Sequence, residues 1–218
     1  MLLDADECQL VLVDYQVRLM PAIFENSQVL ANALRLAQMA RLMQVPVWGT
    51  AQTPDKLGPN LPELQAAIEA AGGKTLSKNH FNAVDDGLGD WLRPPVRKAP
   101  PGPPRGNARS LPKHLQKPAE EEAEGRGVIV VAGCEAHVCL MQTALGLLDE
   151  EFEVWVVTDA CSSRTERNRD AAFDRLAGAG AELVTTEMVA FEWLRTAEHP
   201  LFREMLGLIK QGDSQKNG

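Results

Sequence analysis

The stretch "GVIVVAG" at residues 127–133 is an uninterrupted apolar run between two glycines. Runs of about four to eight apolar residues bounded by glycine are typical of a strand that is buried on both faces. A helix-like run, "CLMQTALGLL" at 139–148, follows after a short loop, and we expect its helix to begin near His137. A buried strand that leads into a helix within a few residues is the repeating unit of an α/β fold.

The same alternation continues on both sides of this unit. We expect further strands at 8–14, 45–50, 74–78, 152–160 and 181–186. We expect helices at 28–44 with Ser27 as N-cap, at 62–73, at 166–178 and once or twice more near the C-terminus. This pattern predicts α/β class: a single domain over residues 1–218, with a three-layer α/β/α fold and a mainly parallel, Rossmann-like six-stranded sheet. Alternation alone leaves a flavodoxin-like strand order open.

Residues 94–125 do not fit this pattern. They hold eight of the fourteen prolines, followed by an acidic run. Such a composition cannot bury enough apolar surface to offset the entropy lost on ordering, so it predicts a disordered insertion at the surface. A lid or a partner-binding arm is the alternative interpretation of this segment.

Composition excludes several functional classes. The formal net charge is −8, whereas surfaces that bind nucleic acid or anionic membranes need clustered Lys and Arg. No apolar run approaches the roughly 18 residues of a membrane-spanning helix. The N-terminal sequence "MLLDADECQL" is acidic where a signal peptide is basic, and four cysteines without an export signal are typical of reduced thiols. We therefore expect a cytoplasmic protein that binds neither membranes nor nucleic acid.

Three chemically useful residues fall at predicted strand ends. Asp14 ends the first strand, Lys78 ends the third, and Cys139 follows the fourth after a short loop. Ligands of open parallel sheets gather at the carboxyl ends of the strands. Each residue alone has an ordinary structural explanation, as a turn acid, a solvated lysine or a small core thiol. Together they supply an acid/base, a cation and a nucleophile, which is what activation of a thiol requires.

Elementary electrostatics then suggests a role for each group. A free thiol has a pKa of about 8.5, so only a small fraction is thiolate near neutrality. A nearby ammonium and a helix N-terminus both favour the thiolate, so we expect the pKa of Cys139 to be lowered. Asp14 can accept the thiol proton and pass it to a leaving amine. A dyad of Cys139 with His80 or His137 is a competing arrangement.

Four segments of the sequence resemble one known family. They are "VLVDYQ", "LSKNHFNA", "VVAGCEAHVCLMQTAL" and "VTDACSSR", which contain Asp14, Lys78, Cys139 and Cys161. In this order they are similar to the isochorismatase-like cysteine hydrolases, and the likeness covers the chain apart from 94–125. The resemblance implies an Asp14–Lys78–Cys139 catalytic triad. It also implies a cis peptide at Cys134–Glu135 and an oxyanion hole made by the backbone N–H groups of Glu135 and Cys139.

The details of the resemblance point to a particular branch of the family. The nicotinamidase branch carries Asp and His metal ligands after the second strand, but "WGTAQTPDKLGPN" contains no His, so we expect neither a metal nor another cofactor. "TAQTPDKLG" is instead similar to the uncharacterised isochorismatase-domain branch, although Ala51 and Ala136 depart from its usual Glu and Thr. The resemblance also implies a homo-oligomer. Substrate contacts are expected from Gln16, Phe24, Gln52 and Phe81.

The resulting hypothesis is a hydrolase that opens a small amide-type C–N bond through an acyl intermediate on Cys139. The alternative is a binding or scaffold protein that keeps the triad without turnover. A nucleotide-binding α/β domain is disfavoured, because the first strand is followed by "DYQVRLMP" and not by a glycine-rich phosphate loop.

Overall fold

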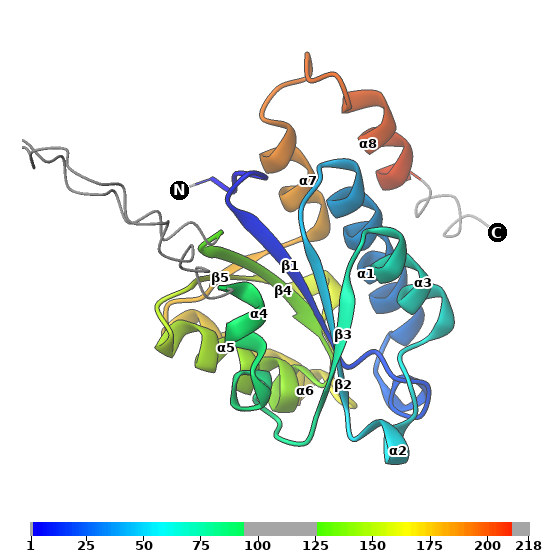
Figure 1. Ribbon diagram of the computed structural model, residues 1–218, viewed down its shortest axis with the longest axis vertical. Coiled ribbons are helices and arrows are strands. Elements are labelled where there is room, and N and C mark those ends of the chain that lie inside the picture. Colours follow the sequence, from blue (N-terminus) through cyan, green and yellow to red (C-terminus); the bar gives the residue numbers. More distant parts are fainter. Residues whose placement is uncertain (1, 94–125, 211–218) are drawn as a thin grey trace, which may run out of the picture.

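One parallel sheet forms the centre of the molecule (Figure 1). The structure, a computed structural model, describes residues 2–93 and 126–210. The strands are β1 (Cys8–Val13), β2 (Val47–Gln52), β3 (Lys74–Lys78), β4 (Val128–Gly133), β5 (Glu153–Val157) and β6 (Glu182–Val184). Their order is β3-β2-β1-β4-β5-β6, and every neighbouring pair is parallel. The predicted α/β class is confirmed, and the order is the Rossmann one that alternation had left open.

Helices cover both faces of the sheet, which gives the three layers. Their bounds are α1 (Asn26–Leu42), α2 (Pro54–Leu57), α3 (Pro62–Ala70), α4 (Leu88–Leu92), α5 (Met141–Asp149), α6 (Glu166–Gly178), α7 (Thr186–Leu194) and α8 (Phe202–Lys210). Helices α1 and α3 lie on one face, and α4, α5 and α6 lie on the other (Figure 1). Helices α7 and α8 pack beside α1.

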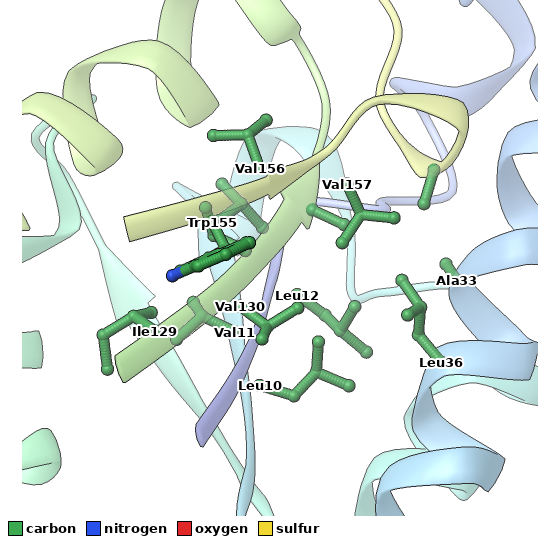
Figure 2. Packing of buried hydrophobic residues seen from close by; sticks show 14 of the residues in the cluster. Leu10, Val11, Leu12, Ala33, Leu36, Ile129, Val130, Trp155, Val156 and Val157 are labelled. Carbon is green, nitrogen blue, oxygen red and sulfur yellow. The ribbon is translucent and has the colours of Figure 1, made fainter. Parts of the chain in front are cut away.

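The central strands β1 and β4 are buried over nearly their whole length. All six residues of β1 are buried, and β4 is buried from Ile129 onward. Figure 2 shows Leu10 and Leu12 of β1 on the side of the sheet that faces Ala33 and Leu36 of α1. A strand that is covered on both faces has no polar side to alternate with, which explains the continuous apolar runs in the sequence.

Several element ends differ from the sequence-based predictions. Helix α1 begins at Asn26, and its N-cap is Glu25, so Ser27 already lies inside the first turn. The hydroxyl of Ser27 bonds to Asn26 Oδ1 and does not cap the helix, so the predicted cap was wrong. Strand β5 ends at Val157, because residues 158–160 form a 3₁₀ turn. The helix predicted at 166–178 is confirmed, and the predicted insertion at 94–125 lies outside the described residues.

Gly133 ends β4 at a point where two backbones come very close. A Cβ placed on Gly133 would lie 2.5 Å from both Cβ and the carbonyl oxygen of Val13 on β1. Only a residue without a side chain therefore allows the carboxyl ends of the two central strands to remain this close.

Replacement of Gly133 by alanine should therefore destabilise the protein. We expect Gly133→Ala to lower the free energy of unfolding by about 1–3 kcal/mol, since the backbone must shift to admit the methyl group. Gly178→Ala is the matched control, because a Cβ there meets nothing within 4 Å. Urea denaturation of both variants is the measurement. Equal stability of the two would contradict the close approach of β1 and β4.

Candidate functional site

The carboxyl edge of the sheet brings together the three residues that the sequence placed at strand ends. Asp14 directly follows β1, Lys78 is the last residue of β3, and Cys139 lies in the turn after β4. Strand β2 lies between β1 and β3, and its last residue, Gln52, is paired with Lys78. Parallel strands point their carboxyl ends the same way, so residues distant in sequence converge here.

Asp14 is held in place by its neighbour on β2. Its backbone N–H donates to the Thr50 carbonyl oxygen at 3.3 Å, and its Oδ1 accepts a hydrogen bond from the Thr50 hydroxyl at 2.7 Å. Its φ of 56° is left-handed, a conformation that Asp tolerates better than most residues. The second oxygen, Oδ2, lies 2.8 Å from Lys78 Nζ, and both side chains are completely buried. This ion pair is the electrostatic centre of the site.

Lys78 is surrounded by acceptors. Besides Asp14, its Nζ donates to Gln52 Oε1 at 2.6 Å and lies 3.3 Å from the carbonyl oxygens of His80 and Phe81. An ammonium has three hydrogens, and four acceptors already face them. A thiolate at Cys139 would therefore have to compete with one of these acceptors for a hydrogen.

Gln52 lies between the ammonium and the thiol. Its Nε2 donates to the Asn79 carbonyl oxygen at 2.7 Å, which fixes the orientation of the amide group. Its Oε1 then faces both Lys78 Nζ and Cys139 Sγ, with the sulfur at 3.9 Å. The sequence predicted Gln52 as a substrate contact but gave no sign of this link between Lys78 and Cys139.

The loop after β3 is fastened at several points. Asp86 Oδ2 accepts hydrogen bonds from the backbone N–H groups of Asn79 and His80, at 2.9 and 2.8 Å. Thr143 on α5 accepts one from the N–H of Ala83 at 3.0 Å. These bonds fix the loop whose carbonyl oxygens face Lys78. The sequence did not reveal them, because they depend on the conformation of this loop and on its contact with α5.

The turn that carries Cys139 is irregular. The Cys134–Glu135 peptide is cis, as the resemblance implied, and a π-helical turn over Ala136–Leu140 precedes α5. The N–H of Ala136 donates to the Ser162 carbonyl oxygen at 2.7 Å. This backbone hydrogen bond supports the turn at the position where Ala136 replaces the usual Thr. Glu135 and Cys139 both lie in this turn, and their role as oxyanion donors stays a prediction.

The pKa of the Cys139 thiol is raised to about 12, and burial is the largest cause. The negative charge of Asp14 is the second cause of this rise, and the ammonium of Lys78 opposes both effects without cancelling them. The expected lowering of this pKa was therefore wrong. The sequence identified the cation correctly, but it did not reveal that the thiol is only 6% exposed.

The predicted pocket residues have different surroundings. Gln16 is fully buried, and its amide bonds to the backbone of Gln52 and to the Gly58 carbonyl oxygen, so a substrate contact would require these bonds to open. Phe24 is half-buried, with the Arg169 guanidinium 5.6 Å from its ring centre. Phe81 is 51% exposed at the loop after β3. Their contact with substrate stays a prediction.

Neither histidine near the site is bonded to the thiol among the described residues. His137 Nδ1 lies 2.9 Å from the Ser163 hydroxyl, and its Nε2 lies 3.4 Å from Asn168 Nδ2. His80 is largely exposed and lies 3.2 Å from Asp86. This arrangement gives no support to a dyad of Cys139 with either histidine.

The described residues contain neither a metal-ligand cluster nor a membrane-spanning helix. Within them, no three His, Cys, Asp or Glu residues lie close enough together to hold a metal ion. Within the same ranges, no helix combines the length and apolarity needed to cross a membrane.

Comparisons with known proteins identify the family to which the chain is similar. The model of the Isochorismatase domain matches residues 115–188. Isochorismatase domain-containing protein 2 of Rattus norvegicus is 32% identical over 202 residues, which are 93% of this chain and 80% of the relative.

Solved structures share the fold over nearly the whole chain. The MAR1 ribonuclease of Caenorhabditis elegans is 26% identical, with a TM-score of 0.78 over 96% of this chain and 92% of its own. YcaC from Pseudomonas aeruginosa, solved with hexane-2,5-diol and covalent acrylamide, is 25% identical, with a TM-score of 0.74 over 99% and 98%. The YcaC gene product of Escherichia coli, described as an octameric hydrolase of unknown specificity, is 24% identical, with a TM-score of 0.72 over 99% and 98%.

The electrostatic account of Cys139 predicts how fast a thiol reagent labels it. Asp14→Asn removes the charge that raises the thiol pKa, so at fixed pH it should speed alkylation of Cys139 about tenfold or more. Lys78→Met removes the opposing cation and should slow it. In the wild type and in both variants, alkylation should become faster as the pH rises toward the thiol pKa, because the thiolate is the species that reacts. Iodoacetamide labelling with peptide mapping is the measurement.

Asp85→Asn is the control, because Asp85 is exposed on the loop after β3 and does not contribute to the shift at Cys139. Slower labelling in Asp14→Asn would contradict the assigned sign of the Asp14 charge.

Proposed function

The chain belongs to the isochorismatase-domain family of hydrolases, and from this premise we propose that it is a cysteine-dependent hydrolase of a small amide-type C–N bond. The observation that carries the proposal is the buried Asp14–Lys78 pair, whose ammonium is linked through Gln52 to the thiol of Cys139. A carboxylate, an ammonium and a thiol in one buried group are the parts of a nucleophilic hydrolase.

The reaction begins with the transfer of the thiol proton. As Cys139 Sγ attacks the substrate carbonyl carbon, its proton moves to Asp14, and the carbonyl oxygen becomes an oxyanion. The N–H groups of Glu135 and Cys139 stabilise that oxyanion. A pKa near 12 means that the resting thiol is neutral, so proton transfer accompanies the attack and does not precede it.

The second half of the reaction returns the enzyme to its starting state. Asp14 gives its proton to the leaving nitrogen as the C–N bond breaks, and a thioester remains on Cys139. Asp14 then takes a proton from water as the water oxygen attacks the thioester. The acid product leaves, and the thiol regains its proton, so atoms and charges balance over the cycle.

The comparison with P. aeruginosa YcaC supports a reactive nucleophile in this fold but not C–N cleavage, because acrylamide alkylates through its alkene carbon and keeps its amide bond. Acrylamide is a small amide and an electrophile that alkylates thiols, and it is covalently bound in that structure. A reactive group that accepts a small amide is what the proposal requires of the present site.

Two alternatives differ in class. A binding or scaffold protein without catalytic activity would have the same three buried residues but would not form an acyl intermediate. Ribonuclease activity, which the name of the C. elegans structure states for that protein, receives no support from the net charge of −8 here.

The remaining predictions concern the setting of the protein. The octameric E. coli neighbour supports the proposal that this chain forms a homo-oligomer. The small-molecule substrate and a cytoplasmic location stay predictions from the sequence.

Replacement of the nucleophile should abolish turnover. Against a panel of small amides, ureas and carbamates, we expect Cys139→Ala to lose all hydrolysis and the acyl mass increase that wild type shows in intact-protein mass spectrometry. Cys134→Ala is the matched control, because that thiol is fully buried five residues earlier and should not react. Activity above a few per cent of wild type in Cys139→Ala would exclude it as nucleophile. A wild type that is never acylated would favour the scaffold protein.

We further propose that Gln52 positions Lys78 for the reaction. Gln52→Met keeps the length of the side chain but removes both of its hydrogen-bonding groups, so kcat should fall about tenfold or more while KM stays unchanged. Gln9→Met is the control, since Gln9 is also buried but bonds to Leu92 and Arg126 at the start of β1. Steady-state kinetics on the best substrate decides the matter, because a raised KM with unchanged kcat would make Gln52 a substrate contact.

A further inference from the structure

A largely buried carboxylate lies in the turn that carries Cys139 and has no part in the proposed reaction. It belongs to Glu135, whose side chain is only 11% exposed. The backbone N–H of the same residue is one of the two proposed oxyanion donors. A carboxylate at this position opposes the reaction, because its negative charge repels the negative charge that develops on the substrate oxygen.

Arg164, in the loop after β5, compensates the charge of Glu135. Its Nε donates to Glu135 Oε2 at 2.8 Å, and its backbone N–H donates to the same oxygen at 3.3 Å. Glu135 has no other ion-pair partner within residues 2–93 and 126–210. Two donors from one residue hold the carboxylate in a single orientation, and a guanidinium stays charged throughout the physiological pH range.

The other bonds between this turn and this loop do not involve the Arg164 side chain. The N–H of Ala136 donates to the Ser162 carbonyl oxygen at 2.7 Å, and His137 Nδ1 lies 2.9 Å from the Ser163 hydroxyl. These bonds keep the loop against the turn when the guanidinium is removed. The contribution of the guanidinium is therefore to orient the carboxylate and to compensate its charge.

We propose that Arg164 is a positioning residue, which holds and neutralises the Glu135 carboxylate so that an oxyanion can form at the N–H groups of the turn. The inference rests on the proposed function, because it needs a reaction in which an oxyanion forms. Arg164 acts through Glu135 and does not touch the substrate. Its loss would leave a carboxylate in a largely buried place without a counter-ion.

A direct contact between Arg164 and an anionic group of the substrate is the competing interpretation. The side chain of Arg164 is 60% exposed, and its two terminal guanidinium nitrogens have no hydrogen-bond partner in the described part of the chain. The two roles differ in their kinetic effect. Loss of a uniform substrate contact raises KM, whereas loss of charge compensation destabilises only the transition state and lowers kcat.

Kinetics of Arg164 variants of the full-length protein test the assignment. Arg164→Gln removes the charge and the Nε donor, so kcat on the best amide substrate should fall about tenfold or more while KM changes by less than about twofold. Arg164→Lys keeps the charge, so its kcat should stay at least about threefold above that of Arg164→Gln. The double variant Glu135→Gln/Arg164→Gln should also recover at least about threefold, because no carboxylate is left to compensate.

Alkylation of Cys139 separates this electrostatic effect from a general disturbance of the turn. Iodoacetamide reacts with a thiol by displacement of iodide, and no oxyanion forms. The charges that act on the Cys139 thiol are those of Asp14 and Lys78. Arg164→Gln should therefore leave the rate of labelling within about twofold of wild type.

Arg167→Gln is the matched control. Arg167 is exposed in the first turn of α6 and forms neither a hydrogen bond nor an ion pair with any residue that the structure describes. Its replacement removes the same charge three residues away from Arg164, so kcat, KM and labelling should all match wild type. Thermal melting shows whether each variant is folded at the assay temperature.

Several outcomes would overturn the assignment. A raised KM with unchanged kcat in Arg164→Gln would make Arg164 a substrate contact. An unchanged kcat, a parallel loss of kcat and labelling, or a double variant no better than Arg164→Gln would also contradict it. A wild type that forms no acyl intermediate while Cys139 is still labelled would overturn the proposed function, and this inference with it.

Discussion

The ion pair between Asp14 and Lys78 is the constraint on which the site depends. Its two side chains lie at the ends of β1 and β3, which are separated by β2. Lys78 Nζ lies 2.8 Å from Asp14 Oδ2, and both side chains are completely buried. Removal of two charges from water costs several kcal/mol per ion, and only close pairing with further hydrogen bonds offsets that cost. The structure supplies these bonds from Thr50, Gln52 and the loop carbonyls. Loss of either charge alone would leave its partner buried and uncompensated, which typically costs about 3–5 kcal/mol.

The need to compensate these buried charges explains the residues around the Asp14–Lys78 pair. Gln52 turns its Oε1 toward Lys78 because its Nε2 donates a hydrogen bond to the Asn79 carbonyl oxygen. The loop that contains Asn79 is in turn held by Asp86, which accepts a hydrogen bond from the Asn79 N–H. Gln16 holds the backbone of Gln52 from the opposite side. Each of these groups satisfies a polar atom that burial would otherwise leave without a partner. The network therefore fixes the geometry of Lys78 without any bound molecule having to organise it.

Much of the fold was predictable because it depends on local patterns. The apolar run of β4 and the helix at 166–178 can be read from periodicity and composition, and parallel topology then brings Asp14, Lys78 and Cys139 to one edge. The boundary errors at Ser27 and at the end of β5 reflect local geometry that competes with propensity. The orientation of the Gln52 side chain and the raised pKa of Cys139 could not be predicted, since both depend on burial and on partners distant in sequence.

The raised pKa of Cys139 constrains how the site can operate. One pKa unit corresponds to 1.36 kcal/mol, so with a pKa of about 12 a free thiolate near pH 7 would lie about 7 kcal/mol above the thiol. In the proposed reaction, formation of the C–S bond would move the negative charge from sulfur to the carbonyl oxygen, where backbone N–H groups could stabilise it. Loss of the Cys139 thiol proton therefore requires the least free energy when the substrate carbonyl is already bound next to the sulfur. Because the resting thiol is neutral and buried beside Asp14, the proposed reaction requires the substrate to be bound before the proton leaves.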